Sequence, residues 1–160
     1  MGQPAARIAD MTAHGSPLAP GPGCPTVLIG GMPAWRGLGP AAVAALASTI
    51  ATGMANVAAA SAAAAAAAAT PAGPAAQANL VKAAADAVAG AASAMASSGA
   101  DIHACPIVKV VIPDGPGVVI TPSMTVTIGG MPAARMGDTI QEATSVNAVA
   151  MGMMTVLIGG

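Results

Sequence analysis

The chain has 160 residues, of which only 7% are charged, and its formal net charge is −1. Lys and Arg together number five, and Phe and Tyr are absent. We therefore expect no nucleic-acid binding, which needs clustered cations for the phosphates and usually aromatic rings for the bases. Hydrophobic residues make up 55% of the chain, but many are Ala, so a core must be built from Val, Ile, Leu and Met against closely packed backbone. At this length we expect one domain with one appended element.

The first 38 residues predict short extended segments rather than helix. A Gly- and Pro-rich loop covers 15–25, and the run VLI at 27–29 is followed by Gly30 and Gly31. This pattern predicts a strand that enters a tight turn. Extended structure is expected to resume at 32–34, because Pro33 fixes its own φ and disfavours helix at the residue before it.

Residues 39–100 predict a helical hairpin. Apolar side chains recur at helical spacing in two Ala-rich runs, at Val43, Leu46, Ile50, Met54 and Val57, and at Leu80, Val88 and Met95. The sequence TPAGP at 70–74 separates the runs, and SSG at 97–99 ends the second. At 1.5 Å per residue the two legs would be about 40 Å and about 35 Å long.

The first leg of this hairpin could also be a membrane span. No charge occurs from 39 to 70, which is long enough to cross a bilayer. The run is mainly Ala, however, and no Trp/Tyr belt or Lys/Arg cluster flanks it. In the second leg Lys82 and Asp86 form a charge pair at i,i+4 spacing. We expect a hairpin that is stable in water, with membrane insertion as the alternative.

Residues 101–160 return to short strands, predicted at 108–112, 118–120, 125–128 and 155–158. The Gly and Pro residues between them exclude long helices in this part of the chain.

One sequence recurs along the chain and predicts a threefold arrangement. The segment TVLIGGMPAWR at 26–36 returns as TVTIGGMPAAR at 125–135 and begins again as TVLIGG at 155–160. The missing half of this third copy, PAAR, occupies 4–7. If the two ends of the chain lie side by side, three equivalent units result. Such a body would suit a threefold-symmetric partner.

The spacing of the copies indicates where the helices are inserted. Arg7 precedes Thr26 by 19 residues and Arg135 precedes Thr155 by 20, whereas 89 residues separate Arg36 from Thr125. About 70 residues are therefore extra in one connection. We predict a body formed by 1–38 and 101–160, with the hairpin of 39–100 inserted into one loop between repeats.

The sequences PAAR at 4–7, DMTAHG at 10–15 and GCPTVLIGG at 23–31 resemble the PAAR-repeat family. Proteins of this family sharpen the spike of type VI secretion systems and related contractile injection machines. The resemblance covers 1–38 and 101–160. It implies a mainly β fold, a small pseudo-threefold cone of short strands that here carries the Ala-rich two-helix insert. It also implies a base that sits on a trimeric VgrG spike, and a point that holds a metal ion, usually zinc.

The metal ligands are expected among the few His and Cys residues. Two His and two Cys in a chain made in the cytosol favour metal binding over disulfides, and a structural zinc needs four ligands. Within the sequences that resemble the family, His14, Cys24 and His103 are the expected ligands. Asp114 stands where similar members carry a His and is the expected fourth ligand, with Cys105 as the alternative. The metal would stabilise a narrow apex that buries little surface.

The repeats also place three arginines at equivalent positions, each matched with an acidic residue: Arg7 with Asp10, Arg135 with Asp138, and Arg36 with Asp101 across the insertion. We expect local ion pairs; the alternative is polar contact with the spike at the base of the cone. Trp35, at the junction with the insert, is expected to pack under the helices, or alternatively to be a hot spot for a partner.

The predicted function is a non-enzymatic spike tip that caps a homotrimeric VgrG-like protein, one copy per trimer, and helps to pierce target membranes. The alternative is a carrier whose insert, 39–100, docks or translocates an effector, or binds a chaperone, with transient membrane contact. No zinc-hydrolase pattern is present in the sequence. No signal peptide is visible, so we expect synthesis in the cytoplasm, assembly on the spike and export into a target cell or the medium.

Overall fold

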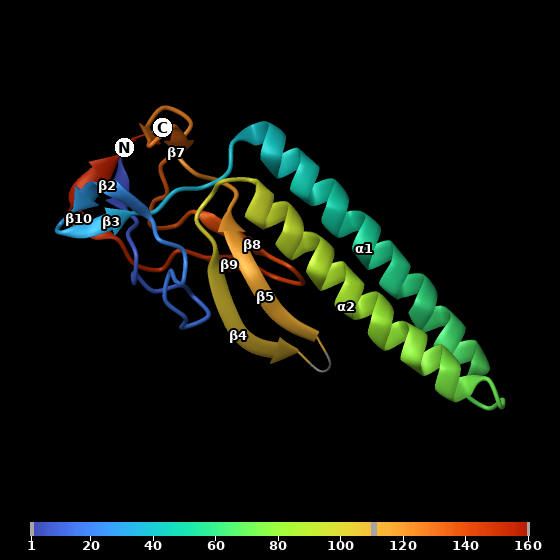
Figure 1. Ribbon diagram of the computed structural model, residues 1–160. Coiled ribbons are helices and arrows are strands. Elements are labelled where there is room, and N and C mark those ends of the chain that lie inside the picture. Colours follow the sequence, from blue (N-terminus) through green and yellow to red (C-terminus); the bar gives the residue numbers. More distant parts are fainter. Residues whose placement is uncertain (1, 110–111, 160) are drawn as a thin grey trace.

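The computed structural model describes residues 2–109 and 112–159 (Figure 1). It consists of a body of short curled strands and one long helical hairpin, which confirms the predicted mainly β fold with a two-helix insert. The elements follow one another as β1 (Gln3–Ala5), β2 (Cys24–Ile29), β3 (Met32–Ala34), α1 (Pro40–Ala67), α2 (Gly73–Ser97), β4 (His103–Lys109), β5 (Ile112–Val119), β6 (Thr127–Ile128), β7 (Met131–Pro132), β8 (Thr139–Glu142), β9 (Val146–Ala148) and β10 (Met153–Ile158).

Three small two-stranded sheets, β2–β3, β6–β7 and β10–β1, are the three copies of the repeat. The turn glycines have φ of 57° and 81° in the first copy and 58° and 81° in the second, the left-handed values that a tight hairpin turn requires. In the third copy β10 pairs antiparallel with β1, with Gln3 opposite Ile158. The two ends of the chain thus complete one unit, and they lie together in Figure 1.

Equivalent residues of the three copies are buried to the same extent. Ile29, Ile128 and Ile158 are 7%, 7% and 6% exposed. They form one apolar cluster with Cys24 and the fully buried alanines of the three copies, Ala5, Ala34 and Ala133. Small side chains are needed at these alanine positions because three strands approach one another there.

A closed ring of backbone hydrogen bonds surrounds the pseudo-threefold axis. Ala6 N–H donates to the Ala134 carbonyl at 3.0 Å, Ala134 N–H to the Trp35 carbonyl at 3.0 Å, and Trp35 N–H to the Ala6 carbonyl at 2.9 Å. The Trp35 side chain is 1% exposed and packs in the β body with Leu18, Val119, Ile140 and Val149. This corrects the expected place of Trp35 under the helices, because its side chain packs in a cluster that contains no buried helix residue.

The largest sheet has four antiparallel strands in the order β4-β5-β8-β9. Its register places His103 opposite Gly117 and Gly117 opposite Glu142. β8 and β9 were not predicted, because each is short and carries polar residues on its partly buried face. The loop before residue 18 lies against this sheet: Ala13 N–H donates to the Ala148 carbonyl at 2.9 Å.

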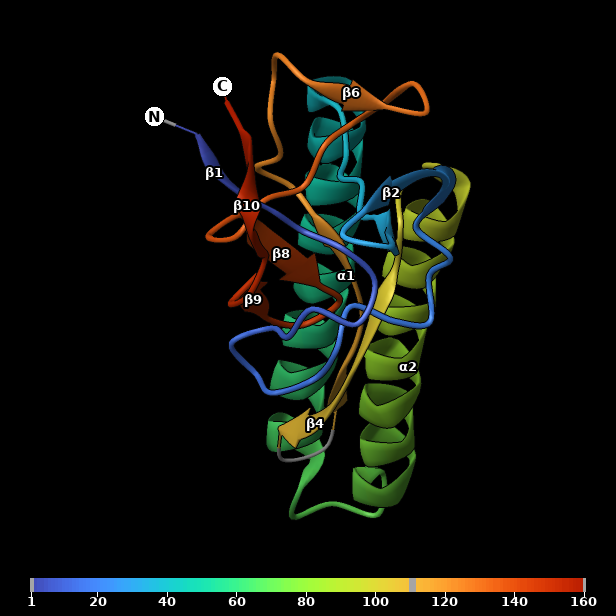
Figure 2. The same cartoon turned by 90° about the vertical axis from the view of Figure 1, so that its left-hand side faces the viewer.

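The helical hairpin packs on the sheet through α2. One apolar cluster contains Leu46 of α1 and Met95 of α2 together with Leu38, Val118 and Ala143. Figures 1 and 2 show the two helices running alongside the body and extending past the strands β4 and β5. Among the described helices, α1 alone is long and apolar enough to cross a membrane by length and composition, and little of it is buried.

Candidate metal centre

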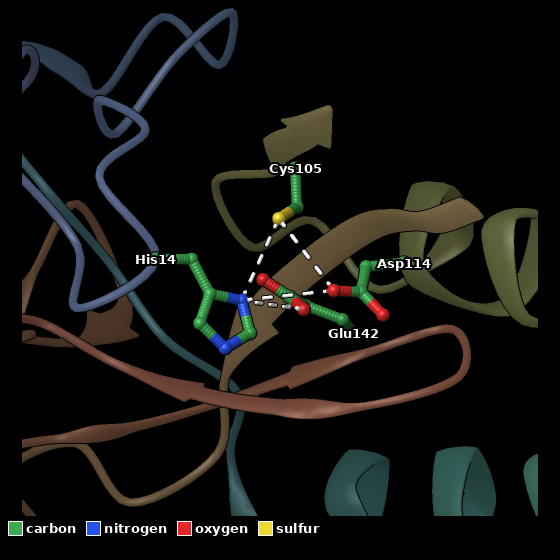
Figure 3. Close-up of side chains that lie close together, drawn as sticks. All are labelled: His14, Cys105, Asp114 and Glu142. Atoms are coloured by element: carbon green, nitrogen blue, oxygen red, sulfur yellow. Dashed lines mark hydrogen bonds and ion pairs between the residues drawn. The ribbon is translucent and has the colours of Figure 1, made fainter. Parts of the chain in front are cut away.

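Four side chains converge on one point of the body: His14, Cys105, Asp114 and Glu142 (Figure 3). One ligand atom from each lies within 4.8 Å of the others. His14 Nδ1 is 3.3 Å from Glu142 Oε2, 3.7 Å from Asp114 Oδ2 and 3.6 Å from Cys105 Sγ. Cys105 Sγ is 3.9 Å from Asp114 Oδ2.

Four separate segments position these residues. Cys105 and Asp114 lie on β4 and β5, near one another across the hairpin, where Cys105 is opposite Gly115. Glu142 ends β8. His14 is in a tight loop closed by a hydrogen bond of 2.9 Å from Thr12 N–H to the Ser16 carbonyl.

The spacing and the chemistry of the group fit a tetrahedral zinc ion. Bonds of about 2.3 Å to sulfur and about 2.0–2.1 Å to nitrogen or oxygen hold tetrahedral ligands about 3.3–3.6 Å apart. The four measured separations of 3.3–3.9 Å are close to these values. Asp114 and Glu142 are both 0% exposed, and a divalent cation would compensate their buried negative charge.

The protonation of the buried groups also fits metal binding. Burial would raise the pKa of Glu142, but hydrogen bonds from Ser145, Asn147 and His103 lower this pKa below its ordinary value. Glu142 is therefore a carboxylate, the form that binds metal. Burial raises the pKa of the Cys105 thiol, so a metal that binds it must displace a proton.

His103 lies beside the group without belonging to it. Its Nε2 is 3.1 Å from Glu142 Oε1, and the side chain is 1% exposed. Burial lowers the pKa of His103 in spite of the opposing effect of Glu142, so the ring is neutral.

Of the expected ligands, the structure brings His14 and Asp114 together, and it adds Cys105, the alternative fourth ligand. It does not bring Cys24 to the group. Cys24 begins β2, belongs to the apolar cluster of the three repeats, and its Sγ lies 3.3 Å from Thr26 Oγ1. Burial among the repeat hairpins therefore removes Cys24 from the expected ligand set.

Glu142 was missed by the reasoning from sequence, although a signal was present. Four of the six acidic residues are matched in the sequence with an Arg or a Lys as expected ion-pair partners. Asp114 and Glu142 are the two that have no such partner in the sequence pattern. Both of these residues are buried in the candidate metal centre.

The three expected Arg–Asp pairs are confirmed, with nitrogen–oxygen distances of 2.8–3.0 Å: Arg7 with Asp10, Arg36 with Asp101, and Arg135 with Asp138. Each arginine also reaches the next copy of the repeat. A Cβ added at Gly30 would lie 2.9 Å from Arg7 Nη1, and Arg135 Nη1 donates to the Gly159 carbonyl at 3.3 Å. The arginines thus join neighbouring units inside the body.

Comparison with known families identifies the C-terminal part of the chain. The family model of the PAAR motif matches residues 111–160, a range that contains Asp114, Glu142 and the second copy of the repeat. This match confirms the resemblance to the PAAR-repeat family for this part of the chain. No curated protein and no solved structure matches the chain.

Proposed function

We propose that this chain, which carries the PAAR motif at 111–160, is the metal-stabilised tip that caps the trimeric VgrG-type spike of a contractile injection machine and helps it to pierce membranes. The observation that carries the proposal is the closure of three equivalent hairpins around one axis, with β1 and β10 as the third. A threefold body can offer the same contact to each subunit of a trimer.

An apolar surface on the repeat hairpins supports this docking. Leu28 and Leu157 occupy equivalent positions and are 59% and 61% exposed, and Val27 and Val156 are 36% and 37% exposed. Met154, beside them on β10, is also exposed. Apolar side chains that gather in the open are typical of a surface that binds another protein. We name the exposed residues of β2 and β10 the base surface.

Arg7, Arg36, Arg135 and Trp35 have a different role in this proposal from the expected contact with the spike. The arginines are held in ion pairs with buried aspartates, and Trp35 is 1% exposed. We assign them to holding the three units together, so that they shape the base surface without touching the partner.

The metal is proposed to be a single zinc ion with a structural role. Its ligands would be His14, Cys105, Asp114 and Glu142, which belong to the N-terminal loop, β4, β5 and β8. One ion would cross-link these four segments and add folding free energy where little apolar surface is buried. A non-enzymatic protein that is made in the cytoplasm and exported on the spike fits this role.

Binding to the spike tests the proposal. The purified chain is mixed with a purified VgrG-type trimer, and the mass of the complex is measured by size-exclusion chromatography with light scattering. We expect one chain per trimer. The double variant Leu28→Asp, Leu157→Asp should bind at least tenfold more weakly, while Val81→Asp, at a residue of α2 that is 50% exposed, should bind like wild type. A wild-type chain that forms no complex contradicts the proposed function.

The two cysteines give a matched test of the metal centre. We expect elemental analysis to find a single zinc in the wild type. Cys105→Ser should lose this zinc, whereas Cys24→Ser should keep it. Zinc loss on Cys24→Ser alone would contradict the proposed ligands.

A second candidate function is that of a carrier, in which the hairpin of 39–100 docks or translocates an effector. It is favoured by the exposure of α1, where only Leu46 and Ala64 are buried. The double variant Ala55→Glu, Ala62→Glu places charges on the exposed face of α1. If this variant assembles on the spike and injects every effector as well as wild type, the carrier function is wrong.

A further inference from the structure

Two buried polar side chains outside the proposed ligands bind the same oxygen of Glu142. His103 Nε2 is 3.1 Å from Oε1, and Asn147 Nδ2 is 2.8 Å from the same atom. The two residues are 1% and 5% exposed, so neither is free to turn towards solvent. The other oxygen, Oε2, lies 3.3 Å from His14 Nδ1 and accepts a hydrogen bond from the Ser145 hydroxyl.

The orientation of the Asn147 amide is fixed by its backbone neighbours. Its Oδ1 accepts hydrogen bonds from the N–H groups of His14, at 3.1 Å, and Ala148, at 2.8 Å. A backbone N–H can only donate, so the carbonyl end of the amide must face these two groups. The NH₂ end therefore faces Glu142, and one side chain joins the loop of His14 to the carboxylate of Glu142.

The hydrogen-bond partner of His103 locates its ring proton in the same way. The carboxylate of Glu142 can only accept, so Nε2 of His103 carries a hydrogen and donates it. A ring nitrogen that holds a proton has no lone pair for a metal. The other nitrogen, Nδ1, is buried without a hydrogen-bond partner and is not among the four converging atoms.

The backbone of β5 packs closely against both His103 and Glu142. A Cβ added at Gly117 would lie 2.8 Å from His103 Cδ2 and 2.9 Å from Glu142 Cγ. Only glycine at this point of β5 allows the ring and the carboxylate to pack against the strand.

We propose that His103 and Asn147 are positioning residues of the metal centre, which hold Oε1 of Glu142 and thereby turn Oε2 towards His14 as the atom that binds the metal. This inference rests on the proposed centre and gives His103 a role other than the ligand role expected from the sequence. Hydrogen bonds to metal-binding side chains typically change metal affinity by about 10- to 100-fold when they are lost.

Zinc affinity, measured by competition with a chromophoric chelator on the full chain, tests the proposal. Asn147→Asp replaces the donor with an acceptor and should bind zinc about 10- to 100-fold more weakly. His103→Ala should show a similar loss, while His103→Gln, which keeps an N–H donor near the position of Nε2, should stay within a few-fold of wild type. Asn56→Asp, an exposed change on α1, is the matched control and should have no effect.

Cobalt substitution separates positioning from ligation. The Co²⁺ absorption spectrum should keep its band shape in His103→Gln, because no ligand is lost, and should change in Glu142→Gln. In the zinc-loaded wild type, ¹H–¹⁵N correlation spectra should show a proton on Nε2 of His103, and this measurement needs no variant to fold.

Four results would overturn the inference. A metal-bound Nε2 of His103 in the wild type would make His103 a ligand, as would loss of stoichiometric binding in His103→Gln while Glu142→Gln keeps it. Wild-type affinity in both Asn147→Asp and His103→Ala would refute the positioning role alone and leave the centre intact. A wild-type chain that binds no zinc would refute the centre itself. Binding to the spike is measured independently of all four results.

Discussion

Replacing Ile158 with alanine should destabilise the protein as much as the same change at Ile29 or Ile128. The three side chains occupy equivalent places in the three hairpins and are 6%, 7% and 7% exposed. Ile158 lies on β10, whose only strand partner in the described part of the chain is β1. Its energetic contribution therefore measures how firmly the two ends of the chain close the third unit.

The expected magnitude follows from the burial. The change removes three carbon atoms, each of which contributes about 0.8 kcal/mol when buried, or about 2.4 kcal/mol together. Incomplete collapse of the cavity places core changes from isoleucine to alanine at about 2 to 5 kcal/mol. The neighbouring residue Leu157 is 61% exposed, so Leu157→Ala should cost less than about 0.5 kcal/mol.

Urea unfolding followed by circular dichroism measures these differences. At a slope of about 2 kcal/mol per M, a loss of 2.4 kcal/mol lowers the midpoint by about 1 M. If Ile29→Ala and Ile128→Ala show this shift while Ile158→Ala unfolds like wild type, the third hairpin contributes no stability. The equivalence of the three units would then be refuted.

Three further predictions concern the insert and its junction. Asp101→Asn should destabilise the protein by about 3 kcal/mol in thermal unfolding, because Asp101 is 1% exposed and Arg36 would lose its charged partner; an unchanged melting temperature contradicts this. Gly53→Leu should push the two helices apart and speed hydrogen exchange in both, since even a Cβ at Gly53 would lie 3.0 Å from the Cβ of Ala87. Exchange rates equal to those of the wild type would show that the helices can separate at no cost. Lys82→Ala should leave the melting temperature unchanged, because both partners of this ion pair are largely exposed, and a clear drop would contradict the reasoning.

Elements whose sequence repeats along the chain, or whose apolar residues recur at helical spacing, could be predicted from the sequence. The three copies share nearly the same residues, and their closure follows once PAAR at 4–7 is taken as the missing half of TVLIGG at 155–160. Helical spacing predicted the hairpin because Ala-rich runs favour helix and the TPAGP break separates them. The ion pair of Arg36 with Asp101 could be predicted in spite of a sequence separation of 65, because the other two copies show the same pattern locally.

The ligand set could be predicted only in part, because it is assembled across the sheet. Glu142 joins His14 through the pairing of β8 with β5 and β9, and neither β8 nor β9 has a strong pattern of its own. Cys24 was expected as a ligand because it lies in GCPTVLIGG at 23–31, a sequence that resembles the family. That same position commits its side chain to the apolar cluster between the repeats. Sequence neighbours do not reveal which side of a strand faces a site when the strand is short and its register is unknown.

The pairing of β1 with β10 also fixes where anything attached to this protein would emerge. Both ends of the chain leave the body at the same hairpin, beside the base surface, and Figure 2 shows the turn between α1 and α2 at the opposite end of the molecule. If the base surface binds the spike as proposed, a tag or domain fused to either end would start next to the spike, and a long fusion would compete with docking for space. A domain attached at the α1–α2 turn would instead leave the base surface free.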